Sequence, residues 1–447
     1  MIDEGVITEF DDEFYGVLID ERGVKISIPG ALIGERVRYH VEHSSPHVQR
    51  AWGRCDALLQ PSLQRQKAPC PLSWPTAGMC PGCPLMHMSG DLQAQLKRQY
   101  VLNCLHRAGL TYLRDIALND APIPLHYRNR SDFVAAEIRG KFILGSYKPR
   151  SHEALEIRRC PILRAPLSQV LSFITHTARK MNLRAARPSP SLTGTLRYVS
   201  LFANDRGHVL VDLVCQSAAG QKPAWIDDFA HALRGFFPIK GVSWSVNDSP
   251  HNAIRVEPSR RLWGLERIDE HYGDIAIPLS ASGFTQLNSD VAAAIYQTAR
   301  QWAGTQPDIA WDLYCGVGGF GRTMRPKRAL YGAEFSPSAI QAAIQAASNA
   351  PFDTHFEVLD LEHQWPDTWP NPDVVLLDPP RKGLSQNVIQ HLLTLRPPKI
   401  LYMSCNPESF AQNAAQLAPH YVIDTLQAFD MMPQTRQVEL LAMLYAR

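Results

Sequence analysis

A cysteine near the end of this 447-residue chain stands where a reactive thiol could be held. Cys405 follows the apolar stretch 400–404 and precedes Pro407, which suits the first turn of a helix expected over 408–417. A thiol at a helix N-terminus has a lowered pKa and more of the nucleophilic thiolate. Because free cysteines are mostly inert core residues, the neighbouring motifs must decide between the two interpretations.

A glycine-rich segment upstream is typical of a nucleotide pocket. Residues 309–314 predict a short buried strand, and the glycines of 315–321 follow with the spacing of the dinucleotide fingerprint. The next expected strand, 329–333, ends in Glu334, where a carboxylate would hold ribose hydroxyls. Proteins that bind NAD and proteins that bind S-adenosylmethionine share this pattern.

The tetrapeptide Asp-Pro-Pro-Arg at 378–381 indicates which of these two cofactors the glycine-rich segment binds. It follows an expected buried strand at 374–377, and open α/β sheets bind their ligands at the carboxyl ends of their strands. An acidic-Pro-Pro segment there resembles the substrate-base loop of adenosylmethionine-dependent methyltransferases. Hydride transfer has no obvious use for it.

Three further motifs narrow the resemblance. Ser-Cys-Asn-Pro at 404–407 and the segment 429–439 look like the two signatures of the RNA uracil-5-methyltransferases, and 284–288 matches the family's Phe-x-Gln-x-Asn element. With the Asp-Pro-Pro-Arg loop, four motifs stand in the family's order, which makes chance agreement remote. The resemblance implies an α/β protein whose class I, Rossmann-like domain uses S-adenosylmethionine.

The resemblance also implies roles for two residues. Uracil C5 takes a methyl group only after addition at C6 has turned the ring into an enolate, and a base must then remove the C5 proton. The family pattern makes Cys405 the nucleophile and Glu439 the general base. Position alone would make Glu439 a polar residue at a strand edge.

Further ligands are carried over from the same family. The residues expected at S-adenosylmethionine are Gln286, Tyr314, Gly316, Glu334, Asp360 and Asp378. The residues expected at RNA are Phe284, Arg128, Arg130, Asp378, Arg381 and Arg436. Asp360 would face the adenine amino group, although a single acid after a strand is ordinarily a solvated turn residue.

Four of the nine cysteines form a second motif, comprising Cys70, Cys80, Cys83 and Cys160. Cytosolic chains rarely use such clusters for disulfides, and Cys-x-x-Cys alone fits zinc or redox chemistry. The runs 80–88 and 160–163 resemble the iron-sulfur elements of the family's ribosomal RNA branch, which implies a 4Fe-4S cluster. Nine residues separate Cys70 from Cys80 where relatives have five, a loop insertion of little entropic cost.

The pattern of expected elements divides the chain into three domains. Residues 1–66 predict short strands with glycine turns, a β-barrel that resembles the OB-like, RNA-binding TRAM domain. Residues 67–270 predict a central α+β iron-sulfur and RNA-binding domain, in which a helix over 91–118 is expected to pack on the catalytic domain. Residues 271–447 are the expected methyltransferase domain.

Basic residues mark two candidate RNA surfaces. From 128 to 159, eight Lys and Arg stand against four acids, interleaved with aromatic residues, although most charge clusters are solvated faces. The first turn of the barrel is acidic, so an RNA face there is expected around Arg36, Arg38 and Arg50. Loops are expected at 188–191 and 217–222.

Composition limits the classes of function. A hydrophobic content of 45% supports real cores, no apolar run reaches the length of a membrane span, and the N-terminus lacks a signal-peptide pattern. We therefore expect a cytoplasmic monomer without a membrane or obligate protein partner. A formal net charge of +2 favours local basic patches and base flipping over bulk attraction to nucleic acid.

The expected substrate is 23S ribosomal RNA, because bacterial tRNA members of the family generally lack both barrel and cysteine cluster. Archaeal tRNA enzymes of similar layout keep a T-loop uridine of tRNA as the alternative. Two interpretations come from other classes. An iron-sulfur NAD-dependent oxidoreductase would bind nicotinamide cofactor, and a non-catalytic RNA-binding assembly factor would not need the pair Cys405 and Glu439.

Overall fold

The computed structural model describes residues 2–75, 79–112, 114–186, 195–217, 220–249, 253–254, 258–304 and 306–447. The loop expected at 188–191 lies outside these residues, as do two residues of the loop at 217–222. Contacts divide the chain into two compact units. Unit 1 comprises Met1–Asn103, Lys148–Ser151 and Met432–Gln437, and unit 2 comprises Cys104–Tyr147, His152–Met431 and Val438–Arg447.

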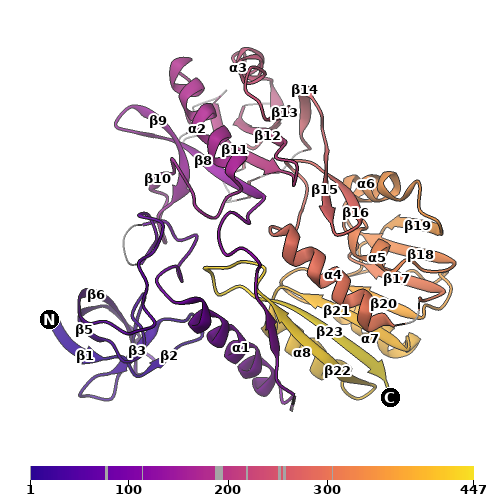
Figure 1. Ribbon diagram of the computed structural model, residues 1–447, viewed down its shortest axis with the longest axis horizontal. Coiled ribbons are helices and arrows are strands. Elements are labelled where there is room, and N and C mark those ends of the chain that lie inside the picture. The colour runs from indigo at the N-terminus through magenta and orange to yellow at the C-terminus, as the bar shows by residue number, and fades with distance from the viewer. Residues whose placement is uncertain are drawn as a thin grey trace. The chain divides into compact units, whose positions relative to one another are not determined.

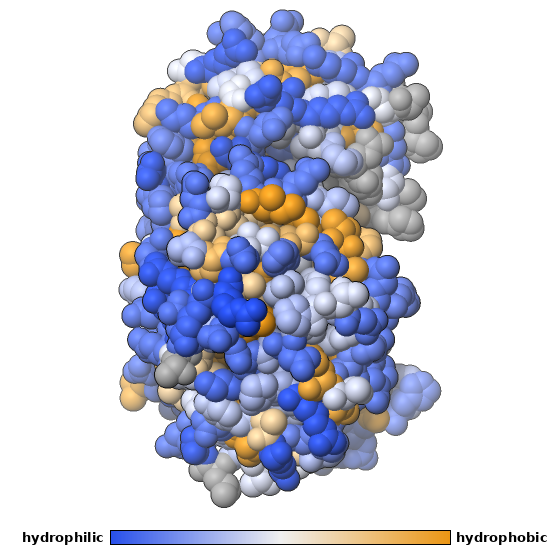
Figure 2. Space-filling view, turned by 90° about the vertical axis from the view of Figure 1, so that its right-hand side faces the viewer, coloured by the Kyte–Doolittle hydropathy of each residue, from blue (hydrophilic) through white to orange (hydrophobic). Residues whose placement is uncertain are grey.

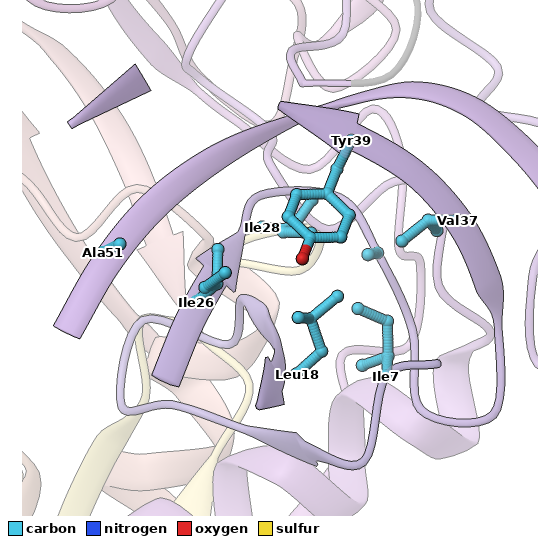
Figure 3. Packing of buried hydrophobic residues seen from close by; sticks show 8 residues of the cluster. Ile7, Leu18, Ile26, Ile28, Val37, Tyr39 and Ala51 are labelled. Atoms are coloured by element: carbon cyan, nitrogen blue, oxygen red, sulfur yellow. The ribbon is translucent and has the colours of Figure 1, made fainter. Parts of the chain in front are cut away.

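A six-stranded sheet forms the N-terminal part of unit 1 (Figure 1). Its order is β1-β5-β6-β4-β3-β2, and the strands are β1 (Ile2–Val6), β2 (Glu9–Phe10), β3 (Gly16–Ile19), β4 (Lys25–Ile28), β5 (Arg36–Ser44) and β6 (Arg50–Gln60). Side chains on one face of these strands build a small apolar core, because neighbouring residues of a strand point to opposite faces. Figure 3 shows this core, which consists of Ile7, Leu18, Ile26, Ile28, Ala31, Val37, Tyr39 and Ala51.

A buried ion pair fixes the chain where it leaves this sheet. The fully buried Glu35 accepts hydrogen bonds from Arg65 Nε at 2.6 Å and Nη2 at 2.7 Å. The amides of Leu32 and Ser62 donate to the same carboxylate. These four bonds offset the cost of burying a charge.

The long helix α1 (Gly90–Arg107) is shorter than expected. It does not continue to residue 118, because Gly109 adopts a left-handed conformation with φ of 73° that ends the helix. Residues Ala117–Asn119 form strand β7 instead, which joins the edge of a sheet in unit 2 beside β22. The prediction of a helix over 91–118 was therefore wrong in its last third.

A seven-stranded, mostly antiparallel sheet lies in unit 2, in the order β10-β9-β8-β11-β12-β13-β14. The strands are β8 (Arg130–Ile138), β9 (Lys141–Tyr147), β10 (Ala154–Glu156), β11 (Thr195–Ala203), β12 (Val209–Gln216), β13 (Ile239–Val246) and β14 (Arg260–Gly264). Helices α2 (Ala165–Lys180) and α3 (Ile226–Leu233) bury apolar faces against it. A hairpin of β15 (Ile268–Tyr272) and β16 (Ile275–Leu279) follows.

An eight-stranded sheet carries the catalytic motifs, in the order β19-β18-β17-β20-β21-β23-β22-β7 (Figure 1). The strands are β17 (Ile309–Leu313), β18 (Ala329–Glu334), β19 (Asp353–Val358), β20 (Val374–Leu377), β21 (Lys399–Ser404), β22 (Tyr421–Phe429) and β23 (Glu439–Ala446). The connecting helices are α4 (Ser289–Ala303), α5 (Gly319–Met324), α6 (Pro337–Ala347), α7 (Gln386–Leu395) and α8 (Pro407–Leu417).

The five strands from β19 to β21 run parallel, and the order reverses between β17 and β20. This is the doubly wound α/β arrangement expected for the C-terminal region, and ligands bind such sheets at the carboxyl ends beside the reversal. Within the described residues, no helix is long and apolar enough to cross a membrane. The face in Figure 2 is mostly hydrophilic, with hydrophobic residues in separate patches.

Candidate active site

Cys405 and Glu439 come from neighbouring strands of the eight-stranded sheet. β21 and β23 pair in antiparallel fashion with Ser404 opposite Leu440. Because Cys405 follows Ser404 and Glu439 precedes Leu440, both residues stand at the same end of this strand pair. Glu439 is buried and Cys405 is partly buried.

The thiol of Cys405 has a raised pKa, not the lowered one that its position before a helix predicted. Burial raises the pKa to about 11, the charges of Glu439 and Asp378 add to this, and Arg381 lowers it. Asn406, not Cys405, caps α8, with its side chain accepting a hydrogen bond from the Glu408 amide at 3.1 Å. The prediction was wrong chiefly because burial disfavours the thiolate, and the charges of the two acids add to that effect.

The two acids that act on this thiol are themselves buried. Burial raises the pKa of Glu439 well above its usual value, and the charge of Asp378 raises it further. Burial likewise raises the pKa of Asp378 to about 8, with contributions from Asp312 and Glu334. Burial and the mutual repulsion of these charges therefore favour the protonated form of each of the three groups.

The glycine loop lies after β17 and bends through left-handed residues. Tyr314, Gly316 and Gly318 have φ values of 65°, 53° and 72°. Glu334 closes the loop, since its carboxylate accepts from the Gly316 amide at 3.3 Å and from the Ser336 amide at 2.9 Å. The structure thus brings Gly316 and Glu334, two of the residues expected at S-adenosylmethionine, into hydrogen-bond contact.

Asp312 braces the same loop and was not singled out by the sequence. It is fully buried within β17, and its Oδ2 accepts a hydrogen bond from the Gly321 amide at 2.7 Å. Burial raises its pKa to about 7. The only signal in the sequence is an acid inside an otherwise apolar strand.

Two further residues expected at the cofactor lie outside the helices and strands. Gln286 is buried in the segment before α4, and the neighbouring Phe284 is 73% exposed. Asp360 follows β19, where its side chain accepts from the Glu362 amide at 3.1 Å. This bond is typical of a residue that shapes a turn, and the second carboxylate oxygen accepts none of the hydrogen bonds found among the described residues.

The arginines expected at RNA fall into both units. Arg381 belongs to the Asp-Pro-Pro-Arg loop, and its carbonyl accepts from Asn406 Nδ2 at 2.9 Å. Arg128 donates through Nε to the Arg130 carbonyl at 2.9 Å at the start of β8. Arg436 belongs to unit 1, where it pairs with Glu13 at 3.0 Å.

The arginines of the basic face expected on the N-terminal sheet are all ion-paired within unit 1. Arg36 and Arg38 pair with Glu4 at 3.3 and 2.8 Å. Arg50 pairs with Asp11 at 2.9 Å. The acids that were expected to displace the RNA face thus pair with the arginines that were expected to form it.

Three cysteines of the expected cluster share one loop of unit 1. The Cys70 carbonyl accepts from the Ser73 amide, and the Cys83 carbonyl accepts from the Ser73 hydroxyl at 3.0 Å. Burial raises the pKa of Cys80, and the charge of Cys70 adds to it. Cys160 belongs to unit 2. Within the described ranges, no three His, Cys, Asp or Glu side chains gather as a group that could hold a metal ion.

Comparison with known proteins decides the family. The family model for tRNA (uracil-5-)-methyltransferases matches residues 369–447. An uncharacterized RNA methyltransferase of Staphylococcus aureus (strain COL) is 30% identical and covers 99% of this chain and 97% of its own length. A second uncharacterized RNA methyltransferase, from Halalkalibacterium halodurans, is 30% identical over 94% of this chain and 92% of its own.

The chain belongs to the RNA uracil-5-methyltransferase family. It is an S-adenosylmethionine-dependent RNA methyltransferase, as the motifs predicted. The fold is also that of the Pyrococcus abyssi tRNA (uracil-54, C5)-methyltransferase, solved with S-adenosyl-L-homocysteine, with a TM-score of 0.77 and 24% identity. That likeness covers 99% of this chain and 100% of the archaeal one.

Proposed function

We propose that this methyltransferase modifies C5 of a specific uridine in 23S ribosomal RNA, with Cys405 as nucleophile and Glu439 as general base. The observation that carries the chemistry is the placement of these two residues at one end of the β21–β23 pair. Their electrostatic coupling to each other and to Asp378 supports a shared reaction site.

The residues act in sequence. The Cys405 thiol gives up its proton to solvent, and its sulfur bonds to uracil C6 while the electron pair of the C5–C6 double bond moves onto C5 as an enolate. C5 then takes the methyl group from the sulfonium sulfur of S-adenosylmethionine, whose S–CH3 bond breaks to leave S-adenosylhomocysteine. Glu439 then accepts the C5 proton, and the bond between C6 and sulfur breaks to release the thiolate. Asp378 and Gln286 would bind the uracil edge or the cofactor, and Arg381 would stabilise the oxyanion charge.

The cofactor pocket proposed here uses the glycine loop. Gly316 supplies an open left-handed turn, Glu334 would hold the ribose, and Asp360 would face the adenine. Tyr314 lines the same turn with positive φ, a strained conformation that functional sites often contain.

We propose ribosomal RNA as the substrate for two reasons. The N-terminal sheet would be a TRAM-type barrel, and Cys70, Cys80, Cys83 and Cys160 would be the ligands of a 4Fe-4S cluster. Cysteine thiolates are the ligands that a 4Fe-4S cluster takes, and such a group would shape the RNA-binding region. Phe284, Arg128, Arg130 and Arg436 are proposed RNA contacts, and the enzyme would act as a cytoplasmic monomer.

A tRNA uridine is the second candidate substrate, because the fold matches the archaeal tRNA enzyme along nearly its whole length. A gene deletion distinguishes the two candidate substrates. In the deletion strain, 5-methyluridine is measured by nucleoside mass spectrometry in separated ribosomal and transfer RNA. Loss from the 23S fraction is expected. Loss confined to tRNA would overturn the substrate and retain the mechanism.

A further inference from the structure

Asn129 joins two segments that stand far apart in the sequence. Its side chain is fully buried, and Nδ2 donates to the Gln286 carbonyl at 2.8 Å and to Ser289 Oγ at 3.0 Å. Its own amide donates to the Leu287 carbonyl at 3.0 Å. One residue therefore holds the 286–289 segment by three hydrogen bonds.

A buried ion pair secures the other end of this contact. Ser289 Oγ, to which Asn129 donates, lies 3.0 Å from Arg164 Nη2 and donates to Glu270. Arg164 and Glu270 form two hydrogen bonds of 2.8 and 3.0 Å, and Arg164 also donates to the Ala203 carbonyl at 2.9 Å. Such a network is rigid, because a buried group that loses its partner is left desolvated.

The position of Asn129 links this network to residues with proposed functions. It stands between Arg128 and Arg130, which lead into β8, while Gln286 stands two residues after the exposed Phe284. The main chain continues the link, since the Asn129 carbonyl accepts from the Ala203 amide in β11 at 2.8 Å. The segment 128–130, proposed to contact RNA, and the segment 284–289, proposed to contact uracil or cofactor, are thus both held by the buried Asn129.

We propose that Asn129 is a positioning residue for methyl transfer, which sets the place of Gln286 in the reaction site and couples it to the Arg128–Arg130 segment. This inference rests on the proposed function, because Gln286 acts there on uracil or cofactor. A misplaced Gln286 would slow the reaction of bound RNA more than it would weaken RNA binding. Asn129 itself touches neither substrate.

Asn247 provides a matched control. It is equally buried, and its Nδ2 likewise donates two hydrogen bonds, in this case to the main-chain carbonyls of Ala253 and Ile254. Asn129→Ala and Asn247→Ala therefore remove the same kind of side-chain bond from unit 2. The isosteric Asn129→Asp keeps the packing but sets an oxygen against the Gln286 carbonyl, and it serves if the alanine variant does not fold.

The test measures covalent capture of 23S rRNA transcripts carrying 5-fluorouridine, at varied RNA concentration, together with hydrogen exchange of the 284–289 peptide. We expect Asn129→Ala to lower the saturated capture rate at least tenfold, leave half-saturation within about threefold, and speed exchange in this peptide. Asn247→Ala should change none of these. Equal losses in both variants, or full activity of Asn129→Ala, would overturn the inference, whereas failure of the wild type to capture RNA would overturn the proposed function.

Discussion

The charge of Glu439 acts on the thiol of Cys405 across the end of the β21–β23 pair, adding to the effect of burial on the pKa of that thiol. A nucleophile and a base placed so close cannot both ionise easily. Their steps in the proposed reaction fall at different times, however, since the thiolate attacks first and the carboxylate accepts a proton only after methylation. The coupling therefore suits an order of steps in which the thiolate charge is lost on attack before the Glu439 carboxylate must accept a proton.

Substitution of each residue should stop the reaction at a different stage. Cys405→Ala should abolish covalent capture of 5-fluorouridine RNA. With ordinary RNA, Glu439→Gln should allow the adduct to form and block its resolution, so that a protein–RNA species accumulates on denaturing gels. Cys55→Ala, a free cysteine of the six-stranded sheet, is the control and should react as the wild type does. Capture by Cys405→Ala would show that another residue is the nucleophile.

The ionisation of Cys405 should follow the charges around it. Alkylation by iodoacetamide, followed by mass spectrometry at this peptide, should accelerate about tenfold per pH unit up to a midpoint near 11. Glu439→Gln removes a charge that raises the pKa and should lower the midpoint. Arg381→Ala removes a charge that lowers the pKa and should raise it. A midpoint below 8.5 in the wild type would contradict the structure.

The sequence revealed the order of the catalytic motifs but not the charges that meet in space. The Pro407 pattern predicted the start of α8 within a residue. The expected effect on the Cys405 pKa was wrong because the fold buries the thiol and because Glu439, 34 positions later, lies at the same end of the strand pair. A pairing of antiparallel strands through a long connection leaves no local signal. Asn129 was missed for the same reason, since its partner Gln286 lies 157 positions away.

Asp312→Asn should change the pH dependence of stability. The raised pKa of about 7 means that the folded protein holds this proton more tightly than the unfolded chain, whose carboxyl titrates near 3.8. Stability is therefore lost as pH rises from about 4 to about 7, by roughly 4 kcal/mol for a shift of this size. Asparagine can still accept the Gly321 bond without this titration.

Calorimetric melting of both proteins between pH 4 and 8 provides the measurement. The melting temperature of Asp312→Asn relative to the wild type should increase across this range. Parallel curves would show that Asp312 titrates normally in the folded protein. Asp308→Asn, in the exposed turn before β17, is the control and should leave the difference flat.

Replacement of one cysteine should test the proposed 4Fe-4S cluster. We expect anaerobically purified protein to contain iron and sulfide and to show the broad visible absorbance of a 4Fe-4S cluster, and Cys80→Ala should lose both. Cys55→Ala should retain them. Zinc without iron in the wild type would replace the proposed cluster by a structural zinc site.

Fold prediction failed where tertiary contacts overruled local pattern. The parallel strands β17, β18 and β20 matched the expected ranges, because a strand buried on both faces is recognisable in the sequence as a continuous apolar run. The three residues of β7 did not, since they form a strand only by pairing with β22 some 310 positions later. Short edge strands of this kind depend on their partner and carry little propensity of their own.

Gly318→Ala should weaken the binding of S-adenosylmethionine. Gly318 has a φ of 72°, and an added Cβ would lie 3.1 Å from the Phe356 ring and 3.2 Å from Ala343. Gly23→Ala is the matched control, because Gly23 has a φ of 79° with no atom near the added Cβ. In both variants the alanine must adopt a left-handed conformation, which costs about 1 kcal/mol. Only Gly318→Ala also displaces side chains that pack against the glycine loop. Titration calorimetry should therefore show at least tenfold weaker binding in Gly318→Ala and unchanged binding in Gly23→Ala, and equal affinities would exclude the loop from the cofactor pocket.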